Sequence, residues 1–90
     1  MNKYLVEFLG TALLMFVILA TGSWLAIGAA LAVAVLLGGH ISGGAFNPAV
    51  TLAMFAAGKL SKPDVMPYII VQIVGALSAF YAYKTFVNKA

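Results

Sequence analysis

The stretch "GGHISGGAFNPAVT", residues 38–51, lies between two parts of the chain that are apolar enough for lipid. It contains four glycines, the only histidine of the chain and an Asn-Pro pair. These residue types form turns and open helices. Irregular backbone at membrane depth is tolerated only where protein buries it or where it lines a watery cavity. The stretch therefore predicts either a re-entrant loop that lines such a cavity or a short loop and helix that lie on the membrane surface.

The composition places the chain in a membrane. Of its 90 residues, 64% are hydrophobic and 8% are charged, whereas a soluble domain carries about 25% charged residues. Residues 8–58 contain no Asp, Glu, Lys or Arg. As one helix this segment would extend about 76 Å, and a bilayer core is about 30 Å thick. The segment must therefore cross the membrane, turn and continue, all within one membrane domain.

Charge and cysteine content argue against other classes. Five scattered lysines against Glu7 and Asp64 give a net charge of +3, which is too sparse for a nucleic-acid surface. Without cysteine there is no disulfide. Lys3, an apolar run and the small residues 20–22 loosely resemble a secretory signal. Glu7 at the start of that run, and the membrane-like sequence after it, argue against this interpretation.

Three segments are long and apolar enough to cross a bilayer: residues 4–20, 24–38 and 64–86. Between the last two, residues 39–57 form the glycine-rich loop and a helix that begins at Pro48. From Pro48 that helix would extend about 15 Å, half of a bilayer. Gly58 and the polar connector 59–62 end it. The sequence thus predicts three full crossings and one half-crossing.

Asn47 is the sharpest candidate for a functional side chain. Pro48 suits the first position of a helix, which makes Asn47 the natural N-cap. Its side-chain oxygen then accepts a helix N–H, and its NH₂ group is left free to donate into a lumen. The helix N-terminus adds a partial positive charge there, which attracts the oxygen of a neutral solute and repels cations. The alternative is a plain cap in a turn.

The other polar groups can each be interpreted as functional or as structural. If residues 38–44 are extended, their backbone would expose carbonyl acceptors to a solute. The structural interpretation of the same residues is a flexible linker. His40 would line a pore mouth or be packed. Intramembrane Glu7 and Gln72 are candidates for function, but we favour hydrogen bonding to the otherwise unpaired loop backbone. No nucleophile–base pair, metal cluster or cofactor loop is visible in the sequence. We therefore expect no enzymatic activity, no bound metal and no cofactor.

At these residues the chain resembles a known family. "HISGGAFNPAVT" is similar to the first pore loop of the aquaporin and glycerol-facilitator family, the major intrinsic proteins, including its Asn-Pro-Ala box. "EFLGT", residues 7–11, and "YIIVQIVGA", residues 68–76, resemble the first and third helices of that family. The resemblance implies an all-α membrane protein with three transmembrane helices and a re-entrant half-helix. It also implies a passive channel for water or small neutral solutes, with these pore residues: Asn47, Pro48 and Ala49 at the midplane, and His40, Ile41, Ser42, Gly43 and Gly44 along the loop.

The sequence departs from the family in showing one repeat where members have two inverted ones. Inverted repeats are a recurring architecture of transport proteins, and a second copy of this chain in inverted orientation would reproduce it, within a larger oligomer of pores. Two alternatives remain. The chain could pair with a separately encoded repeat, or it could be a non-conducting membrane subunit.

The resemblance also suggests a selectivity filter. The second family repeat commonly has Arg directly after its Asn-Pro-Ala box, and here Val50 holds that position. Spacing from Asn47 carries the other filter positions onto Ile27, Val35 and Gly44. All four lack a polar side chain, which favours a glycerol-type facilitator over a strict water pore.

The lysines predict that the chain inserts in both orientations. Lys3, Lys59 and Lys62 fall on one side of the predicted topology, and Lys84 and Lys89 on the other. Lysine bias on short loops sets orientation, and three against two is a weak bias. Single cysteines placed at the two ends should each be labelled from both sides of the membrane. A single fixed orientation would rule out an inverted homodimer.

Overall fold

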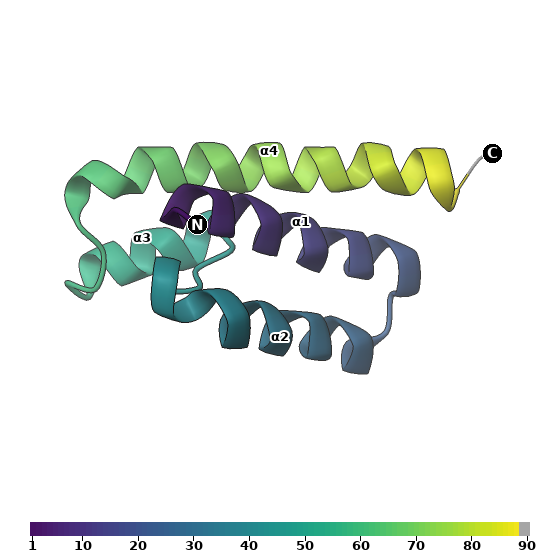
Figure 1. Ribbon diagram of the computed structural model, residues 1–90, viewed down its shortest axis with the longest axis horizontal. Helices are drawn as coiled ribbons and strands as arrows, with labels where there is room; N and C mark the ends of the chain where they lie inside the picture. The colour runs from purple at the N-terminus through teal and green to yellow at the C-terminus, as the bar shows by residue number, and fades with distance from the viewer. Residues whose placement is uncertain (89–90) are drawn as a thin grey trace.

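The computed structural model describes residues 1–88 and, over that range, has four helices joined by short connections (Figure 1). They are α1 (Lys3–Thr21), α2 (Trp24–Ser42), α3 (Pro48–Ala56) and α4 (Lys62–Phe86). By length and composition α1, α2 and α4 can each cross a membrane, whereas α3 has nine residues. The chain is an all-α, multi-pass integral membrane protein with one half-length helix, as the sequence predicts. Lys89, placed at the far end of the topology above, lies outside the described residues.

The order of the helices makes α3 re-entrant. α1 lies between α2 and α4, with α2 running opposite to α1 and α4 running parallel to it (Figure 1). α3 runs beside the first part of α4, toward the end of the bundle where α4 begins. Since α2 ends and α4 begins at that same end, the chain enters and returns on one side. The three crossing helices leave the N- and C-terminal ends on opposite sides of the bundle.

The second helix is longer than the sequence analysis predicted. It ends at Ser42 rather than near residue 38, so His40, Ile41 and Ser42 are helical and not extended. Gly38 stays in the helix because it lies against α1, where a Cβ would meet Val6. The helix ends at Gly43, whose φ of 89° is a left-handed conformation suited to glycine. The irregular loop is therefore shorter than expected and begins at Gly43.

Small residues let the three long helices approach closely. The α2 face against α1 carries buried residues four positions apart: Ala30, Ala34, Gly38 and Ser42. On α4, a Cβ at Gly75 would lie 2.6 Å from the carbonyl oxygen of Phe8. No side chain fits there, so α4 rests directly on the backbone of α1. This close packing fixes the position of α1 relative to α4, and both helices carry buried polar side chains.

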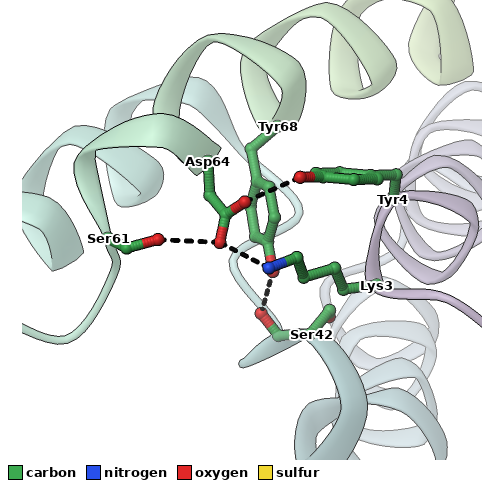
Figure 2. A network of polar contacts seen from close by, with 6 residues as sticks. All are labelled: Lys3, Tyr4, Ser42, Ser61, Asp64 and Tyr68. Atoms are coloured by element: carbon green, nitrogen blue, oxygen red, sulfur yellow. Dashed lines mark hydrogen bonds and ion pairs between the residues drawn. The ribbon is translucent and has the colours of Figure 1, made fainter.

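A polar cluster joins the start of α1 to the start of α4 (Figure 2). Asp64 accepts hydrogen bonds from Lys3 Nζ and Tyr4 Oη, both at 2.7 Å, and from Ser61 Oγ at 2.9 Å. The Lys3–Asp64 contact is also an ion pair. Tyr4 packs edge-on against Tyr68, with ring centroids 5.9 Å apart. The cluster holds α1 and α4 in register at the end of the bundle where α3 returns.

Candidate pore site

The loop is anchored by one buried carboxylate. Glu7 on α1 is fully buried and accepts four hydrogen bonds. Its Oε2 accepts from the hydroxyl of Ser42 at 2.7 Å and the N–H of Ala45 at 3.1 Å, and its Oε1 accepts from the N–H of Phe46 at 2.7 Å. The fourth donor is Gln72 Nε2 at 2.8 Å. Four donors match the acceptor capacity of the two carboxylate oxygens.

Gln72 and Thr51 carry this network into α3. Gln72 on α4 is fully buried, and its Nε2 also donates to the Thr51 hydroxyl at 2.7 Å. Thr51 in turn lies 3.0 Å from the carbonyl oxygen of Asn47, to which its hydroxyl donates. From its place in an apolar segment, Gln72 is expected to bond the loop backbone directly. In the structure Gln72 reaches the site through Glu7 and Thr51, and so connects α1, α3 and α4.

A second contact fixes the end of α2. Tyr68 on α4 is 1% exposed, and its hydroxyl donates to the carbonyl oxygen of Ser42 at 2.6 Å (Figure 2). The Ser42 hydroxyl is turned toward Glu7 and also accepts from the N–H of Gly44 at 3.2 Å. The sequence patterns did not indicate Tyr68 or Thr51 as members of the site. A tyrosine within a membrane helix, whose hydroxyl needs a partner when buried, was the available signal.

The anchored peptide groups orient the loop carbonyls. In a planar trans peptide, the C=O of one residue points opposite to the N–H of the next. Because the N–H groups of Ala45 and Phe46 point at Glu7, the carbonyl oxygens of Gly44 and Ala45 point away from it. Neither oxygen accepts a hydrogen bond from the described residues. Both oxygens are therefore available as hydrogen-bond acceptors.

Asn47 caps α3. Its Oδ1 accepts the N–H of Ala49 at 2.7 Å, and Pro48 occupies the first helical position. The side chain of Asn47 is exposed in the single chain, as are Ala49 and Val50, while Pro48 is half-buried. Its NH₂ group donates to none of the described residues. The cap thus presents two N–H donors, together with the positive end of the α3 dipole, on an uncovered surface.

The structure brings together only some of the filter candidates. A Cβ at Gly44 would lie 3.4 Å from Cγ2 of Val35, so these two positions are neighbours. Ile27 is near the start of α2, at the opposite end of that helix from the loop. Val50 is on the first turn of α3 and 42% exposed. His40 and Ile41, in the last turn of α2, are exposed as well. One copy therefore offers Val35 and Gly44 together and leaves Ile27 apart.

Three crossing helices, a half-length helix capped by Asn47 and a loop held by a buried carboxylate define a membrane-embedded repeat with a re-entrant half-helix. The sequence model described as "Major intrinsic protein" matches residues 1–90. The chain belongs to the major intrinsic protein family, whose members are channels rather than enzymes.

Relatives in the family carry both water-channel and glycerol names. The chain is 47% identical to "Glycerol uptake facilitator protein-like 6" of Lactiplantibacillus plantarum, over 98% of this chain and 45% of the relative. It is 40% identical to "Aquaporin Z" of Rhodopseudomonas palustris, over 87% of this chain and 39% of the relative. The chain thus spans less than half of the length of these relatives. No solved structure matches it.

The hydrogen bonds of Glu7 predict graded effects of two substitutions. Glu7→Gln keeps one acceptor oxygen but sets an NH₂ group against one of the two loop N–H donors. Glu7→Ala leaves both donors without a partner. Each buried unpaired N–H costs about 1–3 kcal/mol, so Glu7→Ala should lower the thermal stability of the protein in detergent roughly twice as much. Equal stability of the two variants would reject the scaffold role of Glu7.

Proposed function

We propose that the chain forms half of a passive channel for water or small neutral solutes, completed by a second copy in inverted orientation. The observation that carries this proposal is the uncovered N-terminus of α3. Asn47, Ala49 and Val50 are exposed there, at the inner end of a helix that stops part of the way across the bundle. Free N–H donors and free carbonyl oxygens at that place suit a solute that both accepts and donates hydrogen bonds.

Membrane physics supports a covering partner. Lipid does not satisfy polar backbone groups, and irregular backbone at membrane depth must be buried in protein or lie in a watery cavity. Besides Asn47, α3 leaves Leu52 53% and Phe55 40% exposed. A second inverted copy would cover this surface with its own α3 and set two Asn47 caps face to face. Such inverted pairs are a common way to build a transport pathway.

The filter proposal depends on the same pairing. Val35 and Gly44 are adjacent in one copy, and Ile27 lies at the other end of α2. An inverted neighbour would bring its Ile27 to the Val35, Gly44 and Val50 of the first copy. The constriction would then be apolar at both ends and would favour solutes with a carbon face. A relative named as a glycerol uptake facilitator, 47% identical, supports a small polyol as solute.

Asn47→Asp tests the midplane role. The aspartate retains a capping oxygen for the N–H of Ala49 but lacks the NH₂ donors. Two facing carboxylates would also attract cations. We expect lower glycerol and water flux and a new cation leak in proteoliposomes that contain only this chain. In the same proteoliposomes, cross-linking of single cysteines near the inner end of α3 should trap two copies of the chain in inverted orientation. Unchanged flux and intact ion exclusion in folded Asn47→Asp would contradict the proposal.

A chain that conducts only when a separately encoded second repeat is present would show that this repeat, and not a second copy of the chain, completes the channel. If neither preparation conducts, the channel function fails.

Val50→Arg tests the filter. A guanidinium brings a fixed positive charge and up to five donors, and it narrows the passage. We expect glycerol entry to fall more than water entry in paired light-scattering assays. Ala57→Arg, just beyond the far end of α3, is the control for an added charge and should change neither rate. Fast water entry without glycerol entry in the unmodified protein would refute the apolar filter.

A further inference from the structure

We propose that Phe46 is the residue that positions the Asn47 amide, and that it does so by seating its ring against Gly10. This inference concerns how the proposed pore site is held, and it rests on the proposed function for its meaning in transport. Phe46 directly precedes the cap and is 2% exposed. It was not among the residues that the sequence indicated.

The backbone of Phe46 is in an unfavourable conformation. Its φ is 53°, and among the described residues it is the only non-glycine with a positive φ. A bulky side chain rarely adopts this left-handed region, and such strain persists only where the surroundings hold it. The next residue, Asn47, returns to extended backbone with φ −162° and then enters α3. The left-handed step at Phe46 therefore sets the direction in which the Asn47 cap faces.

Two contacts hold that step. The N–H of Phe46 donates to Glu7 at 2.7 Å, which fixes one side of the residue. Its ring lies against Gly10 of α1, where a Cβ would overlap three ring atoms. Positions for a Cβ at Gly44 and Gly38 lie 3.6 and 3.8 Å from the same ring. Val6 and Ala34 complete its buried surroundings. The ring thus fills a space that is open because α1 has glycine at position 10.

The contact between the Phe46 ring and Gly10 predicts that a larger residue at position 10 can be compensated by a smaller one at position 46. Gly10→Ala fills this space, so the ring must move and the backbone of Phe46 with it. Phe46→Leu shortens the side chain and makes room for the added methyl. The effects of substituting two residues in contact are coupled, by about twofold to a hundredfold in an equilibrium constant. The double variant should therefore be closer to the unmodified protein than Gly10→Ala is by itself.

The direct readout is the side-chain amide signal of Asn47 in ¹⁵N solid-state NMR of the protein in lipid, one of three asparagines in the chain. Gly10→Ala should shift this signal, and Gly10→Ala with Phe46→Leu should move it back. Gly28→Ala is the matched control, because a Cβ there meets no atom within 4 Å. An Asn47 signal unmoved by Gly10→Ala, or no recovery in the double variant, would overturn the proposal.

A third variant keeps the proposal testable if Gly10→Ala does not fold. Phe46→Gly relieves the left-handed backbone and removes the ring. If the ring positions Asn47, this variant should shift the Asn47 signal more than Phe46→Leu does. If the ring has no such role, Phe46→Gly should preserve the signal better, which would contradict the proposal.

Flux separates the inference from the function on which it rests. In a conducting protein, Gly10→Ala should lower solute flux per folded channel, and the double variant should recover part of the loss. Unmodified protein that conducts nothing would contradict the channel function, whereas the NMR comparison would still decide the role of Phe46.

Discussion

The structure depends on a carboxylate that lipid cannot hydrate. Glu7 is fully buried in a helix that crosses the membrane, and an unpaired charge in such a place is costly. Four donors satisfy it: two loop N–H groups, one hydroxyl and one side-chain amide. Each donor comes from a different residue, and together these residues belong to α2, the loop and α4. The carboxylate and the irregular backbone supply hydrogen-bond partners to each other, so neither is left unsatisfied.

This mutual requirement explains the distribution of small residues. For one carboxylate to reach both the loop and α4, α1 must lie against its two neighbours at short range. Gly75 allows the α4 contact, because no Cβ fits beside the Phe8 carbonyl. Ala34 and Gly38 do the same on α2. The apolar side chains on the outer faces have no such constraint, and they are suited to lipid or to a neighbouring chain.

The sequence predicted the helices better than it predicted the site. The long uncharged segment, the apolar run over residues 64–86 and the Asn47–Pro48 cap were sufficient to place three crossings and a half-length helix. The predicted end of α2 was wrong because Gly38 and Gly39 are residues typical of a loop. Close packing against Val6 requires glycine at position 38 while the helix continues. Glu7 and Gln72 stood out as polar residues in apolar segments.

The residues that the sequence did not indicate act through distant contacts. Tyr68 bonds a residue 26 positions away, and Thr51 bonds Gln72, 21 positions away. Phe46 resembles any apolar membrane residue until its positive φ and its contact with Gly10 are known. Pairing over such separations is decided by how the helices pack. Local patterns carry little information about it.

The anchoring of the loop by Glu7 is tested most directly by amide hydrogen exchange, measured residue by residue with the protein in lipid. The N–H groups of Ala45 and Phe46 both donate to the buried carboxylate, so they should exchange much more slowly than the N–H of Asn47, which has no acceptor among the described residues. Exchange at Ala45 and Phe46 that is much slower than at Asn47 is the result expected of a loop held by Glu7. Fast exchange at both positions, equal to that of Asn47, would show that the carboxylate does not hold the loop.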